Sequence, residues 1–211
     1  SKYSDNADQA KHAEQMVALL TPVAKAFMTD VALESAIAGQ QIFGGHGFIR
    51  EWGQEQHVRD LRITQIYEGT NGIQALDLMG RKIVGTNGSL YKVFEQDVND
   101  FVASQAGNEA AAEFIEPLKA AMENLSDLTQ WVIDQAQSNP NEIGAASVEY
   151  LHVFGYAAYA YMWAKMAVVA LPKQDDSFYK AKVETARFYV KRLLPRYIGL
   201  SAIVKGGAES L

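Results

Sequence analysis

The fold is decided by residues 59–74, which read RDLRITQIYEGTNGIQ. This stretch begins as a charged amphipathic segment, crosses a short polar turn at Glu68-Gly69-Thr70 and continues as an apolar-periodic helix. Gly69 lets another molecule approach the backbone closely, which favours a site at the break. Glu68 is therefore a candidate general base, and a solvated charge at a helix end is the competing interpretation.

The composition of the chain excludes several classes of protein. The 211 residues suffice for one domain or two small ones. With 19 Lys and Arg against 25 Asp and Glu, the net charge of −6 argues against a nucleic-acid surface. The lack of cysteine excludes disulfides, thiolate metal sites and cysteine nucleophiles, and fits an intracellular protein. The four histidines lack metal-ligand spacing, so we expect no metal site.

Helical periodicity runs through almost the whole sequence, and period-2 alternation is nowhere long enough for a strand. Thr21-Pro22 reads as an N-cap and first helical position, which divides the first apolar run in two. We expect helices over about residues 7–20, 22–43, 54–64, 71–85, 90–105, 109–137, 142–171 and 176–204. The sequence therefore predicts an all-α fold with an antiparallel helical bundle in its second half.

The turn Thr86-Asn87-Gly88-Ser89 predicts a boundary between two helical domains, residues 1–86 and 87–211. The chain begins at Ser1 without an initiator Met or targeting peptide, so we expect it to be part of something longer.

Residues 153–171 are long enough to span a membrane and carry only one charge, that of Lys165, so the segment must be considered as a membrane span. However, the segment is rich in Ala and Tyr, and Lys165 and the tyrosine hydroxyls oppose insertion. We expect a central helix of a soluble bundle and no transmembrane segment.

Gly44-Gly45-His46-Gly47 is expected to end the second helix in a loop. The loop resembles the start of a dinucleotide fingerprint, but it follows a helix and lacks the third glycine, so a Rossmann site is rejected. Its backbone N–H groups still suit a phosphate, and a helix C-cap followed by a turn is the alternative.

Three motifs in this order resemble the acyl-CoA dehydrogenase family. They are QIFGGHGF at 41–48, VRD at 58–60 and QIYEGT at 65–70. The resemblance covers about residues 16–85. The continuation over 71–82 is similar to the branch of the family with an extra C-terminal helical domain, which residues 87–211 would form.

The resemblance implies an FAD-dependent oxidoreductase of fatty acid β-oxidation. Such enzymes remove the α-proton of an acyl-CoA thioester and transfer a β-hydride to FAD, giving a trans-2-enoyl-CoA. By its match to the Tyr-Glu-Gly-Thr motif, Glu68 would be the catalytic base, with Tyr67 and Gly69 lining the acyl pocket. Burial would raise the pKa of the carboxylate, and the Glu68 backbone N–H would help polarise the thioester carbonyl.

The cofactor residues also follow from the resemblance. Gln41, Gly44 and Gly45 match the loop that contacts the FAD pyrophosphate, generally of a neighbouring subunit, and Thr70 would contact the FAD of its own subunit. Gly72 stands where many members have Gln, so that FAD contact is not carried over. A cytoplasmic homo-oligomer with electron-transfer flavoprotein or a similar acceptor is implied.

Two alternatives remain open. An acyl-CoA oxidase shares the chemistry and returns its electrons to oxygen. Residues 87–211 are alternatively a non-catalytic oligomerisation or interaction bundle, with Tyr156, Tyr159 and Trp163 on its surface.

Family enzymes carry an N-terminal helical domain and a β-domain before the matching region, so we expect the chain alone to be colourless and inactive. Its acyl group is open between fatty acyl and methylthiopropionyl types.

Overall fold

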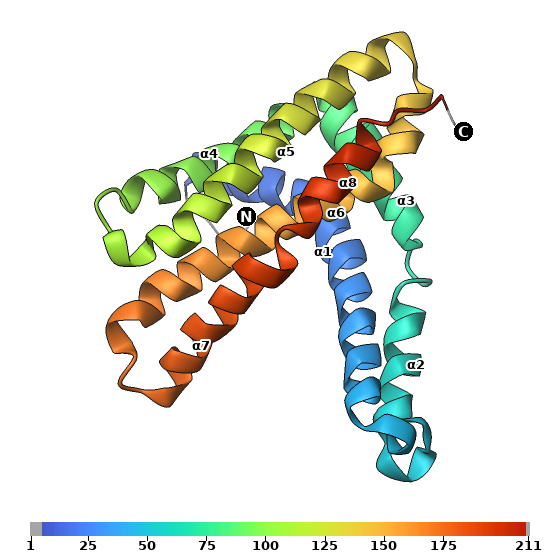
Figure 1. Cartoon of the computed structure of the whole chain (residues 1–211). Helices are drawn as coiled ribbons and strands as arrows, with labels where there is room; N and C mark the ends of the chain where they lie inside the picture. The colour runs from blue at the N-terminus through green and yellow to red at the C-terminus, as the bar shows by residue number, and fades with distance from the viewer. Residues whose placement is uncertain (1–5, 210–211) are drawn as a thin grey trace.

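The computed structural model describes residues 6–209, and within that range the chain is helical with no strand, as predicted. The α-helices in Figure 1 are α1 (Ala7–Ile42), α2 (Gln54–Thr64), α3 (Asn71–Leu76), α4 (Ser89–Ser104), α5 (Ala112–Ser138), α6 (Asn141–Ala170), α7 (Ser177–Phe188) and α8 (Arg196–Val204). Short 3-10 segments are η1 (Gly44–Phe48), η2 (Arg50–Trp52), η4 (Val84–Thr86), η5 (Glu109–Ala111) and η6 (Leu171–Lys173), and the π-helical segments are η3 (Asp77–Ile83) and η7 (Tyr189–Leu193). The all-α prediction is confirmed.

The first helix runs unbroken through Pro22, so the predicted division into 7–20 and 22–43 is wrong. A proline inside a helix removes one hydrogen bond and costs about 3 kcal/mol. Here Leu19, Pro22 and Val23 are all buried in the core, and Phe27 continues the same buried face one turn later. Packing of this continuous apolar stripe offsets the lost hydrogen bond.

The last predicted helix, 176–204, is in fact two. α7 passes into η7, which ends at Leu193, and α8 starts after Pro195. Pro195 has no N–H to continue the hydrogen-bond ladder, and the helix restarts with Ile198 donating to the Pro195 carbonyl at 3.2 Å. The prediction of one helix here is wrong, and both α7 and α8 pack on α6.

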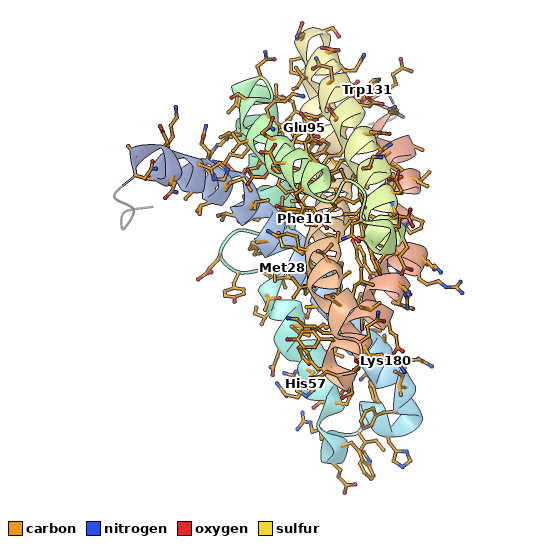
Figure 2. All side chains as sticks on the ribbon, turned by 90° about the vertical axis from the view of Figure 1, so that its left-hand side faces the viewer. Met28, His57, Glu95, Phe101, Trp131 and Lys180 are labelled. Carbon is orange, nitrogen blue, oxygen red and sulfur yellow. The ribbon has the colours of Figure 1, made fainter. Side chains whose placement is uncertain are left out.

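α6 is the central element of the fold. α5, α7, α8 and α1 all pack against it. Figure 1 shows α1 and α2 as a side-by-side pair that projects away from the remaining helices. Figure 2 labels His57 of α2 low in the view and Trp131 of α5 near its top.

Phe27 joins α1 to α6. Its ring packs edge-on against Tyr156 and Tyr159, with ring centroids 5.0 and 4.9 Å apart. Gly155 lies directly beneath the ring, because a Cβ built there would overlap Phe27. The two helices can approach this closely only because residue 155 has no side chain.

The aromatic residues of α6 that were expected on the surface are less exposed than predicted. Tyr156 is only 8% exposed, and its carbonyl accepts a hydrogen bond from the Tyr189 hydroxyl at 2.7 Å. Trp163 is half-buried and stacks on Tyr189, and Tyr159 is also half-buried. Tyr156 is therefore not on the surface as predicted, whereas Tyr159 and Trp163 stay partly exposed and line a pocket together with Tyr189. The role of residues 87–211 as an interaction bundle stays a prediction.

The predicted boundary at 86–87 falls in a tight turn, where Asn87 and Gly88 have φ of +49° and +73°. One hydrophobic cluster among the described residues nevertheless contains Leu19 and Leu78 as well as Phe154. The division into 1–86 and 87–211 stays a prediction.

By length and composition, α1 is the helix of the described range that meets the criteria for a membrane span. Its most apolar window has a mean hydropathy of 1.5 and is 28% buried. Core helices pass the same test, so this is weak evidence. Of the segment 153–171, all but Leu171 lies in α6, which packs against helices on several sides.

Candidate functional site

The loop between α2 and α3 holds Glu68 in an uncommon conformation. Glu68 has φ +52° and Gly69 has φ +84°, so two consecutive residues are left-handed. For a residue with a side chain this costs about 1–3 kcal/mol, and it persists only where the surroundings enforce it. Such positions cluster at functional sites, which directs attention to Glu68.

One hydrogen bond joins the two ends of this loop, and a second holds the Glu68 carbonyl. The Asn71 N–H donates to the Gln65 carbonyl at 3.2 Å, and the Gln74 side-chain amide donates to the Glu68 carbonyl at 3.3 Å. The same Gln74 amide lies 2.9 Å from where a Cβ of Gly69 would be. The positive φ favours glycine at 69, and a side chain there would also displace the Gln74 amide.

The predicted site residues of the loop lie at the surface. Tyr67 is 49% exposed, and Glu68, Gly69 and Thr70 are exposed as well. Within residues 6–209, the backbone N–H groups of Glu68, Gly69 and Thr70 meet no acceptor. Thr70 caps α3 through its carbonyl only, so its hydroxyl makes no capping bond. The loop thus presents a carboxylate, a hydroxyl and several N–H donors, and the residues described build no dry pocket over them.

The glycine loop follows α1 as predicted. Phe43 caps the helix by donating to the Gly39 carbonyl at 3.3 Å, and Gly44 has φ +58°. No atom lies within 4 Å of a Cβ built on Gly44 or Gly45. Gln41 is also exposed, so an incoming group can reach this backbone without a steric barrier.

The two predicted parts of the site are not brought together. Gln41, Gly44 and Gly45 precede α2, whereas the Glu68 loop follows it. The 11 residues of α2 separate them by about 16 Å of helix rise. Figure 1 shows the glycine loop at the tip of the α1–α2 pair, and the Glu68 loop at the other end of α2.

A polar network beneath the Glu68 loop was missed from the sequence. Asp30 Oδ1 accepts from the side-chain amides of Gln65 and Asn71, at 2.5 and 2.7 Å. Asp30 Oδ2 pairs with His152 Nε2 at 2.8 Å. Lys25 Nζ donates to Asn71 Oδ1 at 2.7 Å, which fixes which way the Asn71 amide points.

Asp30 is a charged centre in this network. Burial raises its pKa, but the hydrogen bonds from His152, Asn71 and Gln65 outweigh this and hold the pKa below its usual range. The sequence could have indicated Asp30 as a candidate, because a charged residue one turn after buried Phe27 in an apolar helix is unusual. Its partner His152 is 122 residues away, which periodicity does not reveal.

Metal-ligating side chains do not gather in the described part of the chain, where no group of three or more His, Cys, Asp or Glu has metal-binding geometry. The described residues supply a single carboxylate that can act as a base, backbone N–H donors beside it, and exposed glycines.

Two family models match the chain. One, described as "Acyl-CoA dehydrogenase, C-terminal domain", covers residues 3–83, and the other, "Acetyl-CoA dehydrogenase C-terminal like", covers residues 94–211.

Similar curated proteins are bacterial acyl-CoA dehydrogenases. A butyryl-CoA dehydrogenase of Syntrophomonas wolfei is 28% identical over 100% of this chain and 36% of its own length. A 3-methylmercaptopropionyl-CoA dehydrogenase of Ruegeria pomeroyi is 35% identical over 86% of this chain and 32% of its own. A broad-specificity linear acyl-CoA dehydrogenase of Mycobacterium tuberculosis is 31% identical over 88% and 33%. The chain spans about a third of the length of these relatives.

Proposed function

Because this chain belongs to the acyl-CoA dehydrogenase family, we propose that it is the C-terminal part of an enzyme that converts an acyl-CoA thioester to a trans-2-enoyl-CoA. In this proposal Glu68 is the base that removes the α-proton. The observation that carries it is the left-handed conformation of Glu68 in a closed loop.

The residues of the loop suit the reaction. The α-C–H bond breaks and its proton passes to the Glu68 carboxylate, while the β-hydrogen leaves as hydride to the acceptor that FAD would supply, so that a carbon–carbon double bond forms. The backbone N–H of Glu68 is unpaired within the described residues, and in this proposal it would polarise the thioester carbonyl. Tyr67 and Gly69 flank the carboxylate and would line the acyl pocket.

The exposed glycines fit the pyrophosphate of FAD. Gly44 and Gly45 leave open space where side chains would stand, which permits close approach of phosphate oxygens to the backbone. We assign Gln41, Gly44 and Gly45 to the FAD of a neighbouring subunit and Thr70 to that of its own. When bound, FAD supplies the acceptor for the β-hydride.

The remaining partners are part of the same proposal. The substrate is an acyl-CoA, of the linear fatty or the methylthiopropionyl type that the relatives' names suggest. Ile42 and Phe48 beside the glycine loop are 85% and 80% exposed, and a neighbouring subunit of a homo-oligomer would cover them. We place the enzyme in the cytoplasm, with electron-transfer flavoprotein or a similar protein as acceptor.

The reaction class is tested on the longer enzyme under anaerobic conditions. Butyryl-CoA, methylthiopropionyl-CoA and a long linear acyl-CoA are added in turn, with no electron acceptor present. We expect at least one to bleach the flavin absorbance and yield the trans-2-enoyl-CoA. In air, stoichiometric hydrogen peroxide would instead identify an oxidase, and absence of enoyl-CoA from every substrate would refute the proposal.

The 211-residue chain alone is expected to be colourless after purification. Its glycine loop and its Glu68 loop are exposed and lie about 16 Å apart along α2, so they form no enclosed flavin pocket. Absorbance of the purified chain near the flavin bands measures this. Stoichiometric flavin co-purifying with it would contradict the expectation.

A further inference from the structure

Asp30 holds both ends of the loop that carries Glu68. Its Oδ1 accepts from the side chain of Gln65, where the loop leaves α2, and from the side chain of Asn71, where α3 begins. Those two residues are also joined through their backbones by the Asn71 N–H and the Gln65 carbonyl. One carboxylate oxygen therefore bonds to both ends of the loop that carries Glu68 at its centre.

The other oxygen of Asp30 reaches the second half of the chain. Oδ2 pairs with Nε2 of His152 on α6, and the two side chains are 29% and 25% exposed. The His152 ring also packs edge-on against Phe27, with centroids 5.8 Å apart. Asp30 is thereby also held by α6.

The direction of the Asn71 amide is determined by its neighbours. Lys25 donates to Asn71 Oδ1, so the amide nitrogen faces Thr29 Oγ1 at 2.9 Å and Asp30 at 2.7 Å. Asn71 is the first residue of α3, so this set of bonds also sets where that helix starts. A shift at Asp30 would pass directly to the residues on either side of Glu68.

Resting on the proposed role of Glu68, we infer that Asp30 and His152 are positioning residues for the base. Asp30 fixes the Glu68 loop, and His152 of α6 fixes Asp30, so the C-terminal helices determine the geometry of the catalytic carboxylate. Misplacing a catalytic group by about 1 Å can cost on the order of 100-fold in rate.

The test compares Asp30→Asn with a matched control, Asp97→Asn. Asp97 pairs with His12 at the same 2.8 Å distance and likewise joins α1 to the second half, but it lies on α4, away from the loop. In the 211-residue chain, amide hydrogen exchange is measured at Asn71, whose N–H closes the loop. We expect exchange there to rise about tenfold in Asp30→Asn and to stay unchanged in Asp97→Asn.

His152→Phe is the second variant, and it keeps the inference testable if Asp30→Asn fails to fold. Phenylalanine keeps an aromatic ring beside Phe27 and removes only the hydrogen bond to Asp30. We expect exchange at Asn71 to rise by about threefold to tenfold. Unchanged exchange in this variant would overturn the role given to the C-terminal helices.

In the longer enzyme, Asp30→Asn is expected to lower the rate of flavin reduction about 10-fold to 100-fold, with FAD content and the KM for acyl-CoA unchanged. A variant that also carries Glu68→Gln should show no further loss, because Asp30 acts through Glu68. A normal rate in Asp30→Asn, or equal further loss in the Glu68→Gln background, would overturn the inference. If Glu68→Gln alone keeps its activity, the proposed function fails instead, whatever Asp30 does to the loop.

Discussion

Glu68→Gln in the longer enzyme is expected to slow flavin reduction by acyl-CoA to a small residual rate and to leave FAD bound. Glutamine matches the shape of glutamate and can adopt the same loop conformation, but its amide does not accept a proton. Loss of a positioned general base typically costs about 100-fold to 10,000-fold in rate. Anaerobic stopped-flow absorbance measures the reduction directly.

The control for this variant is Glu109→Gln. Glu109 is an exposed glutamate of η5, outside both predicted parts of the site, and its replacement makes the same change in net charge. We expect it to reduce its flavin at the normal rate. Near-normal reduction by Glu68→Gln would remove Glu68 from the role of base.

Gly155→Ala is expected to destabilise the 211-residue chain by about 1–3 kcal/mol. The new methyl group would overlap the Phe27 ring, which is held in place by Tyr156 and Tyr159, so α1 and α6 must move apart. Replacing glycine by alanine inside a helix otherwise gains up to about 1 kcal/mol, so the overlap must overcome this gain. The free energy of unfolding from urea denaturation measures the net change.

Gly144→Ala is the matched control, because Gly144 lies in the same helix with no atom near its missing Cβ. There the helix propensity acts alone, and we expect an increase in stability of up to about 1 kcal/mol. A Gly155→Ala variant that is as stable as Gly144→Ala would contradict the close crossing of α1 and α6.

The sequence predicted those parts of the fold whose signals are local. Glycines at 44–47 and the polar break at 68–70 punctuate helical periodicity, and α2 begins and ends as expected. Pro22 and Pro195 were harder to interpret. Pro22 reads as a helix start but lies inside α1, because the core packing that offsets its cost comes from α6 and other distant segments.

The candidate site was predictable only where its residues are consecutive. Tyr67 to Thr70 form one motif, and the structure gathers them in one loop. Asp30 and His152 are 122 residues apart in the sequence, on α1 and α6, and their contact depends on how these two helices cross. That crossing depends in turn on Gly155 under Phe27, which is tertiary packing that a single sequence does not express as periodicity.

The claim that Glu68 removes the α-proton is tested most directly by proton exchange. The longer enzyme is incubated in D2O with an acyl-CoA whose β-carbon carries no hydrogen, so that hydride transfer cannot follow. NMR then records replacement of the α-protons by deuterium. We predict exchange in the unmodified enzyme and in Glu109→Gln, and none above background in Glu68→Gln. Exchange by Glu68→Gln at the unmodified rate would contradict the claim.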